Sequence, residues 1–157
     1  MKAIIVCTSV SHGNTKRVAE VIGEVLGARV VAPEEVDPAG LADYDLVGFG
    51  SGIFNGSFHV GLREFVKGLP VGQQRKAFVF ATSGFPEFPF RPFTRPLVRL
   101  LGQKGFEVVD TFSCRALDTL APFKLVGGVR KGRPNAADLA DARAFAENLR
   151  TRIGAAS

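Results

Sequence analysis

Short apolar runs alternate along this chain with longer stretches in which apolar residues recur every three or four positions. The short runs predict five strands, over 2–7, 29–32, 45–50, 76–81 and 106–114. Their β-branched and aromatic content is typical of strands buried on both faces. The longer stretches predict helices over 15–26 and 57–69, after residue 94, and from residue 135 toward the C-terminus. The pattern therefore repeats a strand followed by a helix along the chain.

Polar residues and glycine mark the expected ends of these helices. Gly27 stops the first helix, and Ser57 and Thr94 are predicted to cap the next two. Asn135, with an acidic residue three positions on, is predicted to cap the last. Residues 33–42 are expected to be irregular, with one short helix after an Asp-Pro pair.

Strands that alternate with helices predict an α/β fold with a parallel sheet and helices on both faces. No internal repeat or linker interrupts the pattern, so residues 1–157 are expected to form a single domain. In such sheets ligands bind beyond the carboxyl ends of the strands, where the strand order reverses. The loops to inspect are therefore 8–16, 50–56 and 82–86.

Each of these loops has a composition that suits ligand binding. The first is short and rich in hydroxyl groups and runs into a helix N-terminus, which predicts either an anion site or a plain helix cap. The second is rich in glycine and has the apolar residues Ile53 and Phe54 at its tip. These two side chains are predicted either to contact a ligand or to fold back over the sheet edge. The third leads into a Phe-rich stretch. There we expect Phe85 to contact a flat ligand, and Phe90 and Phe93 to pack under the next helix.

Two other phosphate chemistries are excluded at the first loop. A P-loop needs a Gly-Lys-Ser/Thr sequence, and Gly13-Asn14-Thr15 lacks the lysine. A phosphatase nucleophile at Cys7 needs an arginine six positions on, where the chain has Gly13. Cys7 follows three apolar residues, so we interpret it, like Cys114, as a reduced structural thiol.

Composition is ordinary for a globular protein, with 46% hydrophobic and 22% charged residues. No apolar run approaches the roughly 20 residues that span a bilayer, and the first apolar run is too short for a signal peptide. We therefore expect a cytoplasmic protein without a membrane span. The net charge of +5 is local, because residues 88–135 hold nine Lys/Arg against three Asp/Glu. This excess favours an anionic ligand or partner or, equally, a solvated basic face.

The three loops together resemble those of the flavodoxin family. Residues 11–15 (Ser-His-Gly-Asn-Thr) look like the flavodoxin phosphate loop. Residues 50–52 (Gly-Ser-Gly) are similar to the loop on the inner side of the flavin ring, and residues 81–84 (Ala-Thr-Ser-Gly) to the loop after the fourth strand. The resemblance spans nearly the whole chain. It implies a flavodoxin-like three-layer sandwich, a five-stranded sheet of order 2-1-3-4-5, and flavin mononucleotide (FMN) as cofactor.

The resemblance also implies which residues bind FMN. The phosphate would be bound by Ser9, Ser11, His12, Gly13, Asn14 and Thr15, the ring bordered by Ser51, Gly52, Ile53, Phe54 and Asn55, and its pyrimidine edge or outer face contacted by Thr82, Ser83, Gly84 and Phe85. The chain departs from the family pattern in three respects. Val10 and His12 replace hydroxyl residues of the phosphate loop, Trp is absent where flavodoxins often stack the ring, and the pI is near 9.6 where electron-carrier flavodoxins are typically acidic.

This resemblance implies electron transfer through the bound flavin to a redox partner protein or a small-molecule acceptor. The alternative is an FMN-dependent oxidoreductase acting on a small molecule, of the NAD(P)H/quinone or protoporphyrinogen type, which the basic, Phe-rich region favours. No side chain stands out as a proton donor, since His12 and His59 are the only histidines. The long segment 118–134 is predicted to be either a flap over the flavin or a packed excursion with a basic edge. No nucleic-acid motif is present.

Overall fold

The computed structural model describes residues 1–9, 14–54, 57–83, 94–115 and 134–156. The strands are β1 (Ala3–Thr8), β2 (Arg29–Val31), β3 (Leu46–Phe54), β4 (Ser57–Phe58), β5 (Lys76–Ser83) and β6 (Glu107–Arg115). The helices are α1 (Asn14–Leu26), α2 (Val60–Lys67), α3 (Arg95–Gln103) and α5 (Ala136–Ala156), with two 3₁₀ helices, η1 (Pro33–Glu35) and η2 (Pro38–Asp43). Within these ranges, no helix combines the length and apolarity needed to cross a bilayer.

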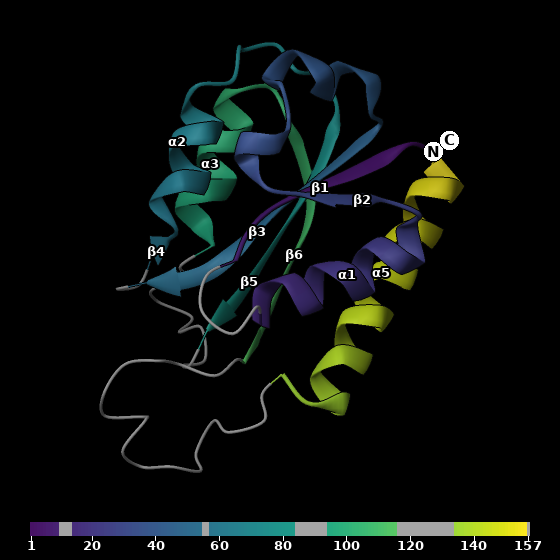
Figure 1. Cartoon of the computed structure of the whole chain (residues 1–157). Helices are drawn as coiled ribbons and strands as arrows, with labels where there is room; N and C mark the ends of the chain where they lie inside the picture. The colour runs from purple at the N-terminus through teal and green to yellow at the C-terminus, as the bar shows by residue number, and fades with distance from the viewer. Residues whose placement is uncertain (10–13, 55–56, 84–93, 116–133, 157) are drawn as a thin grey trace.

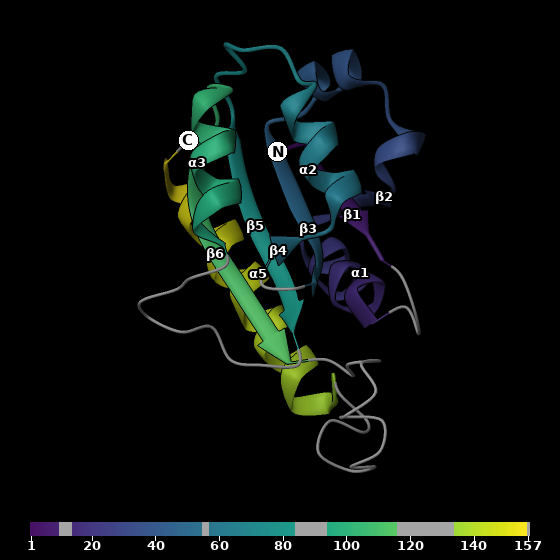
Figure 2. The same cartoon turned by 90° about the vertical axis from the view of Figure 1, so that its left-hand side faces the viewer.

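Five strands form a parallel sheet in the order β2-β1-β3-β5-β6. These are the five predicted strands, so the predicted order 2-1-3-4-5 is confirmed. Figures 1 and 2 show the arrowheads of β3, β5 and β6 at one end of the sheet, and α1 begins near that end. The short β4, which the sequence did not predict, pairs antiparallel with the end of β3.

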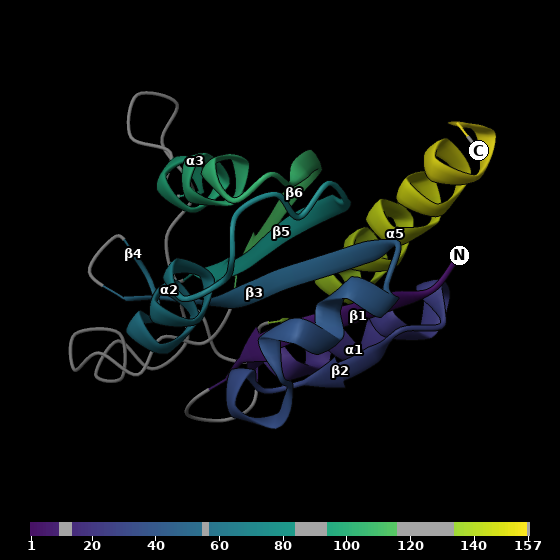
Figure 3. The same cartoon turned by 90° about the horizontal axis from the view of Figure 1, so that it is seen from above.

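Helices cover both faces of the sheet and bury a separate core on each. Figure 3 shows α2 and α3 on one face and α1 and α5 on the other. Under α2 and α3, residues such as Val47, Phe49 and Leu62 are fully buried. Under α1 and α5, Phe78 and Phe80 fill the core. The period-two alternation of strand side chains thus gives every inner strand two buried faces.

Two glycines of β3 make room for these phenylalanines. Gly48 is the cross-strand partner of Phe78, and Gly50 is the partner of Phe80. A Cβ atom at Gly50 would lie 2.1 Å from Cζ of the Phe80 ring, and one at Gly48 would lie 2.3 Å from Cζ of Phe78. The rings therefore lie directly over the glycine backbone, and β3 can run through this position only without a side chain.

Three predicted element ends are wrong. β3 was expected to end at Gly50 but continues to Phe54, because its ladder with β5 runs to the pair Gly52–Thr82 and β4 then pairs with residues 53 and 54. Ser57 does not cap α2, since it lies in β4. β5 was expected to end at residue 81 but continues to Ser83. Thr94 holds the N-cap position of α3 as predicted, although its side chain makes no capping hydrogen bond.

The other predicted helix ends are confirmed. Gly27 follows α1 with a φ of 65°, a conformation that favours glycine. Asn135 caps α5: its Oδ1 accepts a hydrogen bond from the Asp138 N–H at 3.0 Å, and Asp138 Oδ2 accepts one from the Asn135 N–H at 2.8 Å. The short helix expected after Asp37 is η2, and the Asp37 side chain caps it.

Candidate functional site

The sheet register brings the three candidate loops to one edge. Thr8 at the end of β1 is the cross-strand partner of Ser51, and Gly52 is the partner of Thr82. The strand order reverses between β1 and β3, because β2 follows β1 on one side and β5 follows β3 on the other. The predicted site therefore lies at a topological switch point, where ligands of such sheets bind.

A pair of buried hydroxyl groups joins α1 to the central strands. Oγ1 of Thr15, in the first turn of α1, lies 2.7 Å from Oγ1 of Thr82 near the end of β5, and both residues are buried. One hydroxyl donates to the other, so the pair retains one hydrogen that it can donate elsewhere. This contact holds the N-terminus of α1 against the carboxyl ends of the strands. That Thr15 binds a phosphate and Thr82 contacts a flavin ring stays a prediction.

The N-terminus of α1 has the polarity of an anion site. Ser9 Oγ accepts a hydrogen bond from the Lys16 N–H at 3.2 Å, so the hydroxyl lies at the start of the helix. The first turn contains no acidic residue. The helix dipole and the N–H groups of residues 14 and 15 therefore give this end a positive potential that no side-chain carboxylate of that turn offsets.

Thr8 is a site residue that sequence reasoning missed. Its Oγ1 is buried and has no hydrogen-bond partner among the described residues. A buried hydroxyl without a partner is costly, and such groups in native proteins usually have a ligand, an ion or a water. The available signal was a hydroxyl side chain directly after the predicted first strand and before the predicted phosphate loop.

Ser51 contributes to the site by ordering its backbone. It is fully buried, and its Oγ donates to the Gly52 carbonyl at 2.7 Å and accepts from the His59 N–H at 3.0 Å. These bonds tie the end of β3 to the residue that precedes α2. Ile53 is half-buried and packs against the core under α2 and α3, as the alternative of folding back over the sheet predicted. That Ser51, Gly52 and Ile53 border a flavin ring stays a prediction.

His59 is the N-cap residue of α2. Its Nδ1 accepts a hydrogen bond from the Gly61 N–H at 2.9 Å, which makes it the N-cap that the sequence assigned to Ser57. The position of His59 between the Ser51 hydroxyl and α2 ties the helix to the end of β3. No catalytic role was predicted for His59.

The remaining predicted site residues divide into two groups. Thr82 and Ser83 are buried at the end of β5, and Asn14 is half-buried at the start of α1. Outside the described residues lie Ser11, His12, Gly13, Asn55, Gly84 and Phe85, the packing residues Phe90 and Phe93, and all of the segment 118–134 except Pro134. Of Phe54 only the backbone is described, and it pairs with Ser57.

Cys7 belongs to the core and is no nucleophile. It lies under α1 in the same core as Phe80, and burial raises the pKa of its thiol from 9.0 to about 12. A thiol with this pKa stays protonated at neutral pH. The structure shows Cys7 and Cys114 as thiols and not as a disulfide, in agreement with the prediction.

Some known proteins are similar to this chain in sequence, and others are similar in fold. A model of the flavodoxin domain family matches residues 5–93. An uncharacterised protein of Methanocaldococcus jannaschii is 38% identical over 149 residues, which cover 95% of this chain and 98% of that protein. A flavodoxin from the domain Archaea superposes with a TM-score of 0.69 at 18% identity, covering 98% of this chain and 99% of that one. Oxidised flavodoxin 2 from Bacillus cereus gives a TM-score of 0.69 at 18% identity over 93% and 95% of the two chains.

The structural matches extend over almost the full length of both chains and show the same fold. The family model covers more than half of the chain and includes the ends of β1, β3 and β5. The chain therefore belongs to the flavodoxin domain family.

Proposed function

We propose that this protein binds FMN at the carboxyl ends of β1, β3 and β5 and passes electrons through it to a redox partner. Membership of the flavodoxin domain family supports the flavin. When bound, FMN supplies the one- and two-electron chemistry of its isoalloxazine ring, and the protein provides binding, orientation and access. The single observation that carries the proposal is the buried Thr8 hydroxyl at the end of β1, which has no hydrogen-bond partner among the described residues.

The described residues fit a phosphate ester at this position. Thr8 Oγ1 has no hydrogen-bond partner among the described residues, so it is available to donate to a ligand. The Thr15–Thr82 pair has one hydrogen left to donate, and the Ser9 hydroxyl lies at the N-terminus of α1. A phosphate accepts hydrogen bonds through three oxygens, so it can take donors from all three places. Asn14, with the predicted Ser11, His12 and Gly13, would complete this phosphate site.

The flat ring would lie between the end of β3 and the end of β5. The Gly52 backbone, held by the Ser51 hydroxyl, and the half-buried Ile53 would border one side. Thr82 and Ser83, with the predicted Phe85, would contact the other. In flavodoxins a peptide of the second loop turns to bond the reduced ring, and Asn55-Gly56 would be that peptide here. The β3–β4 pairing and the bond from the His59 N–H to the Ser51 hydroxyl hold the described part of this edge in place.

FMN binding is tested by fluorescence titration of the flavin-free protein with FMN and, separately, with riboflavin, which lacks the phosphate. Thr8→Val keeps the shape of the side chain and removes its hydroxyl. Loss of a hydrogen bond to a charged group is worth about 1.5–3 kcal/mol, so we expect FMN to bind roughly ten- to a hundredfold more weakly and riboflavin unchanged. Thr111→Val, on the exposed part of β6, is the matched control and should leave both affinities unaltered.

Two results would contradict the proposal. FMN binding that Thr8→Val leaves unchanged, or weakens as much as it weakens riboflavin binding, would remove the phosphate site from this edge. Steady-state NADPH oxidation with a quinone acceptor would contradict the carrier role and favour a small-molecule oxidoreductase.

A further inference from the structure

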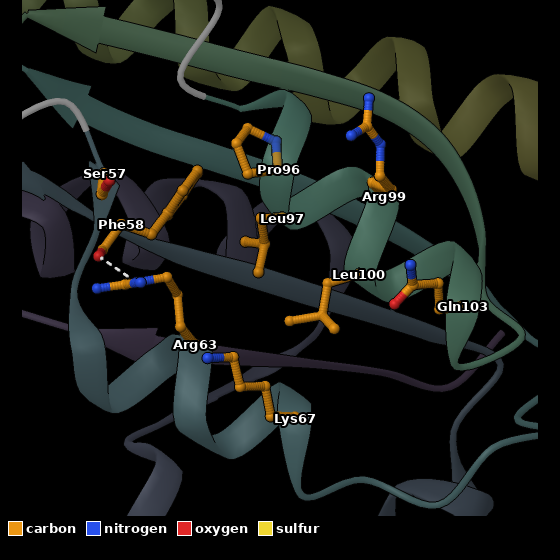
Figure 4. A pocket seen from close by; sticks show the side chains of 9 residues that line it. All are labelled: Ser57, Phe58, Arg63, Lys67, Pro96, Leu97, Arg99, Leu100 and Gln103. Atoms are coloured by element: carbon orange, nitrogen blue, oxygen red, sulfur yellow. Dashed lines mark hydrogen bonds between the residues drawn. The ribbon is translucent and has the colours of Figure 1, made fainter.

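A groove of about 290 Å³ runs between α2 and α3, on the sheet face opposite α1 and α5. Its apolar side chains are Phe58 from β4 and Pro96, Leu97 and Leu100 from α3. Figure 4 shows Leu97 and Leu100 pointing from α3 toward α2, so the space between the helices has an apolar floor. The groove lies near the lower end of the volume range of small-molecule pockets.

The rim of the groove is basic. Arg63 and Lys67 are one turn apart on α2, and Arg99 lies on α3. Residues 57–68 and 94–104, which carry both helices, contain five Lys/Arg and one Glu. They therefore hold four of the chain's five net positive charges. The glutamate, Glu64, contacts Lys67 at 3.5 Å, and both side chains are more than half exposed, so this ion pair neutralises little of the rim.

Arg63 is held in place for a ligand. Its Nε donates to the Phe58 carbonyl at 3.1 Å, which anchors the guanidinium at the β4 end of the groove. Its two terminal nitrogens have no partner among the described residues. An anchored guanidinium with free donors loses little side-chain entropy when it binds a carboxylate.

The charges surround the groove without meeting at one point. In Figure 4 Arg63 and Lys67 lie on the α2 side, whereas Arg99 points away from α2 on the far side of α3. A single phosphate group needs cations that converge on it, and here apolar side chains separate them. An extended surface with an apolar centre and a cationic rim matches a protein segment that presents apolar side chains flanked by carboxylates.

The groove begins beside the proposed flavin site. Phe58 and Ser57 line its end, and they pair with Ile53 and Phe54 of β3, which are predicted to border the ring. A segment docked here would therefore hold its protein next to that edge of the molecule. Electron transfer needs such proximity, and rim charges raise the rate of encounter.

We propose that the α2–α3 groove, defined by Phe58, Arg63, Lys67, Leu97, Arg99 and Leu100, docks an acidic segment of a redox partner protein. Docking at the groove does not depend on flavin binding, since none of the groove residues is predicted to bind FMN. Only the identity of the partner as a redox protein rests on the proposed function. The expected partner inserts one or two apolar side chains into the space between α2 and the Leu97 and Leu100 side chains of α3. Its carboxylates form ion pairs with Arg63, Lys67 and Arg99.

The test uses a synthetic 14-residue helical peptide with leucines on one face and glutamates beside them. Its binding is followed by amide chemical shifts of the protein, both flavin-free and with FMN added. We expect shifts at α2, α3 and β4. The double variant Lys67→Glu/Arg99→Glu should weaken binding about tenfold or more, because both side chains are exposed and both charges reverse.

Matched controls separate charge, apolar contact and flavin. Arg29→Glu/Arg150→Glu makes the same charge change on exposed residues of β2 and α5 and should leave the affinity within about twofold. A peptide with alanines in place of the leucines, and one with lysines in place of the glutamates, should bind far more weakly.

Equal binding of the alanine peptide, equal weakening by both double variants, or shifts outside α2, α3 and β4 would overturn the docking proposal. The docking proposal would also be overturned if inorganic pyrophosphate competed with the peptide and its binding were lost in Lys67→Glu/Arg99→Glu. That result would assign the groove to a small anion. Because the shifts are measured without flavin as well, a protein that docks the peptide but takes up no FMN would refute the proposed function alone.

Discussion

The fit of Phe80 over Gly50 predicts how closely the inner sheet is packed. Gly50 has extended backbone, so its lack of a side chain is required by space and not by φ. In Gly50→Ala the new Cβ would lie 2.1, 2.3 and 2.4 Å from three atoms of the Phe80 ring. Real Cβ contacts of this kind stay above 3.0 Å, so the ring or the strand must move by roughly an ångström.

The ring has little room in which to move. Phe80 is fully buried and stacks on Phe78 at 6.2 Å between ring centroids, and Phe78 in turn contacts Phe145 of α5 at 5.9 Å. Overpacking a filled core costs about 1–3 kcal/mol, and an off-rotamer side chain adds about 0.5–1.5 kcal/mol. We therefore expect Gly50→Ala to lower the free energy of unfolding by about 2–4 kcal/mol, which a typical domain survives.

Urea denaturation followed by circular dichroism measures this loss, and Phe80→Leu identifies its cause. Leucine lacks the outer ring atoms, so in the double variant Gly50→Ala/Phe80→Leu the two losses should not add, and at least 1 kcal/mol should be recovered. Gly102→Ala is the control: no atom lies within 4 Å of its new Cβ, and alanine in helix α3 should stabilise by up to about 1 kcal/mol. The steric argument would be refuted if Gly50→Ala lowered the free energy of unfolding by less than about 0.5 kcal/mol, as an ordinary surface substitution does. It would also be refuted if the losses of the two single variants added in the double variant.

Three further effects follow from single contacts. Because burial raises the pKa of Cys7 to about 12, the folded state keeps a proton that the unfolded state releases above pH 9. The free energy of unfolding, measured by urea denaturation, should therefore fall by about 1.4 kcal/mol more between pH 8 and 10 in the natural protein than in Cys7→Ala. Equal pH dependence of the two proteins would contradict this. His59→Ala removes the acceptor of the Gly61 N–H and should cost about 1 kcal/mol in the same assay, with His59→Asn recovering most of it. Asp138→Ala breaks the reciprocal cap with Asn135, so thermal melting should drop by roughly 2–4 °C, and an unchanged melting temperature would show that the cap adds nothing.

The fold was predictable because each inner strand is a short apolar run followed by a helix with a clear apolar stripe. The ends of β3 and β5 were not. Both strands were expected to stop at the first small or polar residues, yet Ser51, Thr82 and Ser83 continue the sheet. Their hydroxyls can lie in a buried ladder because partners from other elements, His59 and Thr15, satisfy two of them. Such partners are distant in sequence, so a local pattern cannot reveal them.

The candidate site was predictable as a place but not as a set of contacts. Loop composition and strand order indicated the edge formed by β1, β3 and β5, and the register confirms that their ends are neighbours. The same reading assigned ring contact to Ser51, whose hydroxyl is used within the protein, and passed over Thr8, whose hydroxyl has no partner among the described groups. Whether a hydroxyl is satisfied depends on burial and geometry, which a sequence pattern does not encode.

The two proposed anion-binding places would use different physics, and their salt dependence distinguishes them. At the edge of the sheet the described donors are neutral: the hydroxyls of Thr8 and of the buried Thr15–Thr82 pair, with the dipole of α1. Buried groups of this kind are screened little. In the groove the attraction comes from exposed charges such as Lys67 and Arg99, and the screening length falls from about 30 Å at 0.01 M salt to about 3 Å at 1 M. Raising potassium chloride from 10 to 500 mM should therefore weaken binding of the acidic peptide strongly and of FMN only slightly. If both affinities fell together, exposed cations would be the common source of attraction, and the assignment of the phosphate to buried neutral donors would be wrong.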